Sequence, residues 1–332
     1  MIEILLAIFF ITVLLLFLSS GIWVAISMIG VSSIGMILFT SRPVGDAMAT
    51  TIWGASSSWT LTALPLFVWM GEILFRTKLS ENLFEGLAPW LQKLPGGLIH
   101  VNVVGCALFA AISGSSAATV ATVGKMSIPE LRKRKYPEKI LLGSLAGSGT
   151  LGLLIPPSII LIIYGVTVQE SIAKLFIAGI IPGIMIALIF MGYVIIWSLL
   201  NKNKMPLTEE NYSFLNKLSK SKQLIPVILL ILGVIGSIYT GIATATEAAS
   251  LGVVGALILS YFQKSLNLKT FKESLLGATK TSCMIAFILA GATFLSLAMG
   301  FTGLPRNLAI WIQNMELSPY VLIFVLMIFY II

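Results

Sequence analysis

Two clusters of small polar residues interrupt apolar segments near the middle of the chain. The first is Ser-Gly-Ser-Ser at residues 113–116, and the second runs from residue 147 to residue 157. A helix in hydrocarbon is broken only where it is buried in protein or lines a polar cavity, because each backbone N–H and C=O needs a partner there. Freed carbonyls and hydroxyls suit a small cation such as sodium, whereas helix N-termini suit an anionic substrate. Secondary transporters build their binding sites from these groups.

The two breaks define a set of candidate site residues. The candidate sodium ligands, mostly through backbone carbonyls, are Ser113, Gly114, Ser115, Gly149 and Thr150. The candidate substrate residues are Ser116, Pro156, Pro157 and Ser158. Close helix packing is the competing interpretation, since Gly143, Gly147, Ser148 and Gly152 have the spacing of a small-residue face. The double proline inside an apolar run, together with two breaks on either side of one loop, favours a site.

The composition indicates what kind of chain carries these breaks. Of its 332 residues, 58% are hydrophobic and only 10% are charged, whereas a soluble domain carries about a quarter charged residues. No charge lies between Glu3 and Arg42, and that stretch is too long for a single span of about 20 residues. We therefore expect an all-α polytopic membrane protein. The net charge of +8 comes from basic loops, which indicates topology and no nucleic-acid partner.

The basic loops predict one orientation for the first half. Residues 125–139, 201–222 and 263–272 carry lysine and arginine and are expected in the cytoplasm, with the N-terminus outside. Residues 19–21 divide the first two spans, residues 42–58 read as an external loop, and a third span covers 61–75. A helix in the membrane interface is expected at 80–93. A re-entrant hairpin at 96–124 and a broken helix at 140–165 then carry the two breaks, and a span at 175–200 completes the half.

The second half is expected to repeat the first in inverted orientation. Spans at 224–239, 242–262 and 275–299 follow the linker, and adding 221 to each residue number overlays the order of elements. The predicted domains are a first repeat at 1–200, a cytoplasmic linker at 201–222 and an incomplete second repeat at 223–332. The overlay ends before the counterpart of the first break, so we expect residues 1–332 alone not to transport.

The remaining candidate residues have ordinary structural interpretations. Glu247 is expected to cap a helix, Glu72 is ambiguous, and His100 is expected to be a satisfied core histidine. Cys106 and Cys283 are expected to be small buried hydrophobes. No catalytic, cofactor-binding or metal-site spacing of His, Cys, Asp or Glu is present, and neither GxGD nor HExxH occurs, so an enzyme is not expected.

Three long segments carry a resemblance to a known family. They are PGGLIHVNVVGCALFAAISGSSAATVATVG, GTLGLLIPPSIILIIYG and KLFIAGIIPGIM. The sequence resembles the large membrane subunit of tripartite ATP-independent periplasmic (TRAP) transporters, the DctM-like permeases, over nearly its whole length. The resemblance implies sodium symport of an organic acid by alternating access in the bacterial cell inner membrane, the acid being a C4-dicarboxylate, a sialic acid or a similar carboxylate. It also implies a DctP-like periplasmic solute-binding protein and a DctQ-like small four-helix membrane subunit as partners.

Other functions stay open at this point. A transporter of related fold could couple to protons or work without a binding protein. A channel is less consistent with inverted broken helices, which suit alternating access better than an open pore. The sequence does not select one organic acid.

Overall fold

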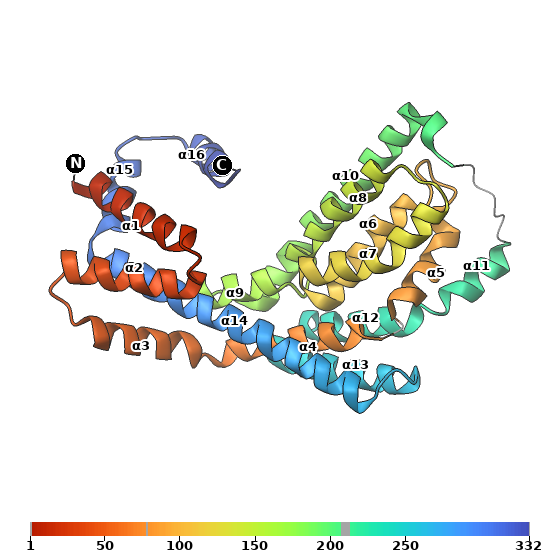
Figure 1. Cartoon of the computed structure of the whole chain (residues 1–332), viewed down its shortest axis with the longest axis horizontal. Coiled ribbons are helices and arrows are strands. Elements are labelled where there is room, and N and C mark those ends of the chain that lie inside the picture. Colours follow the sequence, from red (N-terminus) through yellow and green to blue (C-terminus); the bar gives the residue numbers. More distant parts are fainter. Residues whose placement is uncertain (1, 78, 207–212, 332) are drawn as a thin grey trace. The chain divides into compact units, whose positions relative to one another are not determined.

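The computed structural model describes residues 2–77, 79–206 and 213–331, and every regular element in those ranges is helical (Figure 1). Three described helices are long and apolar enough to cross a membrane, or up to five if each of two bent pairs counts as one span. The chain divides into two compact units. The first comprises residues 1–57 and 284–332, and the second comprises residues 58–283.

The first unit contains α1 (Ile2–Ser19), α2 (Val24–Phe39), α3 (Val44–Ser56), the end of α14 (Leu268–Phe301), α15 (Leu304–Gln313) and α16 (Pro319–Ile331). The division between α1 and α2 is confirmed. Gly21 makes the turn at φ +77°, a conformation that glycine adopts without steric cost. The core of this unit contains Met36, Phe294 and Ala298, all of them fully buried.

The predicted external loop at 42–58 is wrong, because α3 occupies most of it. Its serine, threonine and glycine content suggested irregular structure, yet Val44, Ala47 and Met48 pack against the buried Met36 cluster. The helix is therefore stabilised by tertiary packing that its composition does not reveal.

The second unit begins with η1 (Trp59–Thr62) and α4 (Ala63–Phe75), which correspond to the predicted third span, followed by α5 (Leu79–Leu91) at the predicted interface helix. The hairpin helices α6 (Ile99–Ser113) and α7 (Ser116–Lys133) come next. The interrupted helix consists of α8 (Glu138–Gly149), η2 (Thr150–Leu153) and α9 (Ile159–Val168). α6 packs against both α7 and α8, and the three lie side by side (Figure 1).

The rest of the second unit contains α10 (Ile172–Leu200), η3 (Lys202–Lys204), α11 (Phe214–Ser221), α12 (Ile225–Tyr239), α13 (Ala245–Phe262) and the start of α14. α13 packs along α4 and α12. The predicted spans at 175–200, 224–239 and 242–262 are thereby confirmed as helices, and their crossing of a membrane follows from length and composition only.

Three predicted loops are partly helical. α7 continues through the basic stretch to Lys133, because Val123, Ser127 and Leu131 recur at four-residue spacing and are all buried. α14 begins at Leu268, where Asn267 Oδ1 accepts a 2.7 Å hydrogen bond from the Thr270 N–H. The linker at 201–222 contains η3 and α11, and its residues 207–212 lie outside the described residues.

Candidate functional site

The first break is a two-residue turn between α6 and α7. Gly114 takes a left-handed conformation at φ +59°, and its N–H donates to Ala110 O at 3.0 Å, which ends α6. Ser115 is the N-cap of α7, and its Oγ accepts from the Ala118 N–H at 3.4 Å. The predicted turn at residues 113–116 is therefore present between two packed helices, and the re-entrant course of this hairpin in a membrane stays a prediction.

Hydroxyl groups at the hairpin tip are bonded to one another. Ser113 Oγ lies 3.0 Å from Thr119 Oγ1, and Thr119 Oγ1 donates to Ser115 O at 2.7 Å. Ser113 Oγ also accepts from the Ser115 N–H at 3.3 Å. Both hydroxyl residues are buried, Thr119 completely. The tip is consequently a preformed polar turn whose oxygen atoms lie close together inside the unit.

The second break is longer and begins later than the sequence indicates. α8 ends at Gly149, one 3₁₀ turn follows, and regular structure is lost only at residues 154–158, which contain the cis Pro156–Pro157 bond. Ser158 is fully buried at the N-cap of α9, and its Oγ donates to Leu153 O at 2.7 Å. Thr150 is exposed at the start of η2, and its Oγ1 donates to Gly147 O in the last turn of α8 at 2.7 Å.

The two breaks touch each other. The Ile159 N–H donates to Gly114 O at 3.3 Å, so α9 begins directly on the hairpin tip. A Cβ atom built on Gly114 would lie 2.5 Å from Pro157 O, and one built on Gly152 would lie 3.0 Å from Ser116 N. At Gly114 the left-handed φ and the close backbone oxygen leave room for glycine only, whereas at Gly152 a side chain would need the hairpin backbone to shift by a few tenths of an ångström. Of the candidate residues, the close contacts join Gly114 and Ser116 to the second break.

Gly71 is a residue of this region that the sequence analysis missed. It lies on α4, and a Cβ atom built there would be 2.8 Å from the Ser113 Cα. Thr119 was also missed as a member of the tip, whereas Gly152, which the sequence analysis placed on a close-packing face, does lie against the hairpin at Ser116. A glycine inside an apolar helix is a signal for close helix packing, and Gly71 carries that signal in the sequence.

Asn102 joins the hairpin to the first part of the interrupted helix. Its Nδ2 donates to Leu141 O at 3.2 Å and lies 3.0 Å from Ser144 Oγ, both on α8. The side chain is fully buried, and its Oδ1 has no hydrogen-bond partner among the described residues. α6 and α8 are thus connected by polar bonds in an otherwise apolar contact.

Asn102→Ala should destabilise the fold by about 2 kcal/mol, because it removes two buried hydrogen bonds and leaves a small cavity. Ser144→Ala removes only one of the two bonds and should cost about half as much. Unfolding of the purified protein in mixed micelles of increasing denaturing detergent measures both. Equal stability of Asn102→Ala and the parent protein would show that these bonds contribute nothing.

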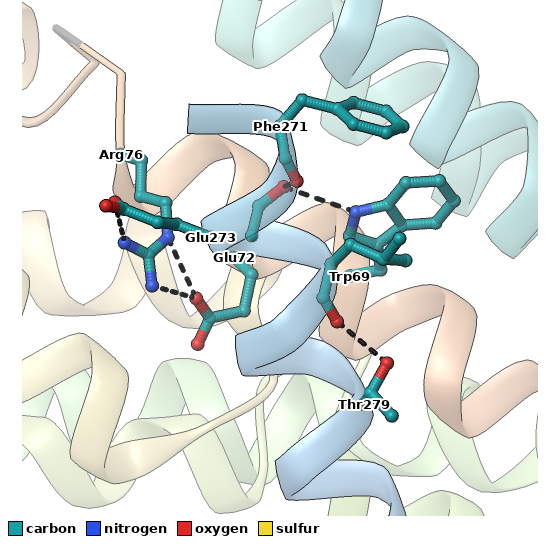
Figure 2. A network of polar contacts seen from close by, with 8 residues as sticks. Trp69, Glu72, Arg76, Phe271, Glu273 and Thr279 are labelled. Atoms are coloured by element: carbon teal, nitrogen blue, oxygen red, sulfur yellow. Dashed lines mark hydrogen bonds and ion pairs between the residues drawn. The ribbon is translucent and has the colours of Figure 1, made fainter. Parts of the chain in front are cut away.

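An ionic cluster connects α4 to the start of α14 (Figure 2). Arg76 Nη2 lies 3.2 Å from Glu72 Oε2, and Arg76 Nη1 lies 3.0 Å from Glu273 Oε2. Beside it, Trp69 Nε1 donates to Ser274 Oγ at 3.3 Å. The cluster resolves the ambiguity of Glu72, whose carboxylate pairs with arginine and joins two helices.

The other candidate residues have mixed outcomes. Glu247 forms the expected capping box with Thr244 at the start of α13. His100 is buried with Nε2 2.8 Å from Pro95 O, as expected of a core histidine, although Nδ1 has no partner among the described residues. Cys106 is buried, but the expectation for Cys283 is wrong because it is exposed on α14. The next residue on α14, Met284, is exposed as well.

Two further observations limit the chemistry available. Burial raises the pKa of Tyr136, whose hydroxyl accepts from the Leu98 N–H at 3.1 Å, so this residue is a neutral tether between the hairpin and the loop before α8. Within the described residues, no group of three His, Cys, Asp or Glu side chains could hold a metal ion.

Three apolar helices of spanning length, together with shorter apolar helices such as α6 and α9 that meet at the two breaks, are typical of a polytopic helical membrane protein. Residues 11–332 match the family described as "Tripartite ATP-independent periplasmic transporter, DctM component". The chain belongs to this family of transporter permeases, which are not enzymes.

Curated relatives support the assignment. The chain is 32% identical over 298 residues to the C4-dicarboxylate TRAP transporter large permease protein DctM of Pseudomonas aeruginosa, covering 90% of this chain and 69% of the relative. It is 32% identical to the sialic acid TRAP transporter large permease protein SiaM of Vibrio cholerae, with 92% and 70% covered. It is 33% identical to the isethionate TRAP transporter permease protein DctMQ of Oleidesulfovibrio alaskensis, with 89% and 46% covered.

Proposed function

We propose that this chain is the large membrane subunit of a transporter that takes up an organic acid by sodium symport in the bacterial inner membrane. A DctP-like periplasmic binding protein delivers the acid, and a DctQ-like small membrane subunit completes the complex. The observation that carries the proposal is the contact between the two breaks, with Gly114 O bonded to the Ile159 N–H. Three of the relatives are named as transporters of C4-dicarboxylate, sialic acid and isethionate. All three of these substrates are anions.

Sodium is proposed to bind through carbonyl oxygens of Ser113, Gly114 and Ser115, with Gly149 and Thr150 on the opposite side. Thr119 Oγ1 lies within this group of oxygens, which supports a small-cation site of preformed geometry. The substrate carboxylate is proposed to bind near Ser116 and residues 156–158, because α7 and α9 both begin at the breaks. Helix N-termini carry unpaired N–H groups and partial positive charge, which favour an anion.

An inverted repeat is part of the proposal, and the element order supports it. Adding 221 carries Val24 and Phe39 of α2 to positions 245 and 260, inside α13. The same shift carries Ile99, the start of α6, to position 320, one residue after the start of α16. Left-handed glycines also make both of the corresponding turns, Gly21 at φ +77° and Gly241 at φ +72°. With the basic loops on the inside, the second repeat then has the opposite orientation to the first.

Uptake by the complete transporter in proteoliposomes tests this function. Labelled succinate, sialic acid and isethionate should each be tried, with the matching binding protein and an imposed sodium gradient. We expect accumulation of one acid that requires both the sodium gradient and the binding protein. Equal uptake without the binding protein would support the alternative, a transporter of related fold that works alone, and uptake driven only by a proton gradient would refute sodium coupling.

A further inference from the structure

The motif KLFIAGIIPGIM at residues 174–185 has no part in the site described above. It lies in the first half of α10. Phe176, Gly179 and Gly183 are buried there, and their spacing of three and four residues places them on one face of the helix. Ile181, on the opposite face, is 77% exposed. Two glycines of the motif therefore lie on the face that α10 turns toward the rest of its unit.

Both glycines lie against the irregular residues of the second break. A Cβ atom built on Gly179 would lie 2.6 Å from Leu154 O and 3.1 Å from Leu161 Cδ1. One built on Gly183 would lie 2.9 Å from Ile155 Cγ1. The Ile155 side chain can rotate away, whereas Leu154 O belongs to the backbone. A side chain at position 179 therefore requires the backbone of the break to move.

The irregular segment at 154–158 is in contact with α10 at one end and with the hairpin tip at the other. A Cβ atom built on Gly114 would lie 2.5 Å from Pro157 O, so the hairpin tip leaves no space beside this residue. Ser158 Oγ donates to Leu153 O at 2.7 Å, which joins the two ends of the segment. A displacement where α10 touches the segment is consequently passed on to Pro157 and Ser158.

We propose that Gly179 is a positioning residue for the substrate. By letting α10 approach Leu154, it fixes residues 156–158 so that Ser158 and the first turn of α9 meet the substrate carboxylate. This inference rests on the proposed function, which places the acid at these residues. The proposed sodium ligands Gly149 and Thr150 lie in helical turns before the segment, where intrahelical hydrogen bonds hold them. A shift at Leu154 therefore disturbs the substrate more than the ion.

Equilibrium binding to the purified complex of both membrane subunits tests this role. The probe is the labelled acid, among succinate, sialic acid and isethionate, that the parent transporter accumulates in proteoliposomes. At saturating sodium, Gly179→Ala should raise the dissociation constant of this acid about fivefold or more, because small misplacements of binding groups have large effects. The dissociation constant of labelled sodium, measured without acid, should change less than about twofold. A merely structural role would lower the fraction of folded protein and leave both dissociation constants unchanged.

Two substitutions on the same helix serve as graded controls. Gly183→Ala meets a side chain that can rotate, so the dissociation constant of the acid should rise only about two- to threefold. Gly192→Ala has no atom of the described residues within 4 Å of its Cβ and should bind the acid as the parent does. If Gly179→Ala does not fold, the difference between Gly183→Ala and Gly192→Ala decides the proposal.

The possible failures are distinguishable. Unchanged affinity for the acid in Gly179→Ala and Gly183→Ala, or an equal loss of affinity for acid and sodium in Gly179→Ala, would overturn the positioning role alone. Absence of sodium-driven uptake by the parent transporter would instead overturn the proposed function, and this inference with it.

Discussion

Gly114→Val should abolish sodium-dependent uptake while the protein still inserts in the membrane. The residue sits at φ +59°, where a β-branched side chain costs roughly 1–2 kcal/mol, and its Cβ would meet Pro157 O at 2.5 Å. The two breaks must therefore separate, which displaces the carbonyls of the hairpin tip from the proposed ion. A change of about 1.4 kcal/mol is tenfold in affinity, so we expect apparent sodium affinity to fall more than about tenfold. Uptake at graded sodium concentrations measures it.

Two comparisons separate the site from backbone strain. Gly241 has a similar left-handed φ of +72°, and no atom of the described residues lies within 4 Å of a Cβ built there. Gly241→Val should therefore keep its sodium dependence. Gly143→Val on α8 also has open space and controls for added bulk near the interrupted helix. Normal uptake by Gly114→Val with unchanged sodium affinity would show that the ion binds elsewhere, and a sodium-induced rise in melting temperature gives a second readout without transport.

Gly71→Val should lower both stability and uptake. Its Cβ would lie 2.8 Å from the Ser113 Cα, which is backbone and cannot rotate away as a side chain can. α4 would have to move off the hairpin tip, and overpacking of this kind costs about 1–3 kcal/mol. We expect Gly71→Val to unfold at a lower fraction of denaturing detergent in mixed micelles. We also expect weaker sodium-dependent uptake, because the contact of α4 with Ser113 supports the polar turn at the hairpin tip.

Gly192→Val is the matched control for this prediction. Gly192 lies inside α10, another apolar helix, and no atom of the described residues comes within 4 Å of its added Cβ. The substitution has the same helix-propensity cost and the same change in volume, so its unfolding midpoint isolates the close contact at Gly71. If both variants unfold at the same detergent fraction, the approach of α4 to the hairpin does not limit stability.

Hydrophobic pattern and local breakers predict most helices of this chain but not all of them. The turn at Gly21, the hairpin tip and the proline break follow from residues that act within a few positions of themselves. α3 and α11 could not be predicted this way. α3 is ordered by the buried Met36 cluster, and α11 is held by Trp90, which is far away in sequence.

The candidate site shows the same limit. The sequence placed the first break correctly at residues 113–116. A glycine and three serines within an apolar run favour the end of one helix and the N-cap of the next at that point. It placed the second break too early, since Gly149 and Thr150 still belong to helical turns and the irregular residues are 154–158. Whether Gly-Ser-Gly-Thr ends a helix or packs within it depends on what lies against it, and α6 and α7 pack against that segment.

By itself, the sequence determined that this is a helical membrane protein with two interrupted helices, and it identified the permease family. Those properties depend on the hydrophobicity of each segment and on its local backbone preferences. Both can be read from one segment without knowing what packs against it. Only the tertiary structure decided that Gly114 meets Pro157 and Ile159, that Gly71 lies against Ser113, and that α5 orients α11. Such contacts depend on distances of a few tenths of an ångström between segments remote in the chain, and residue types alone do not specify them.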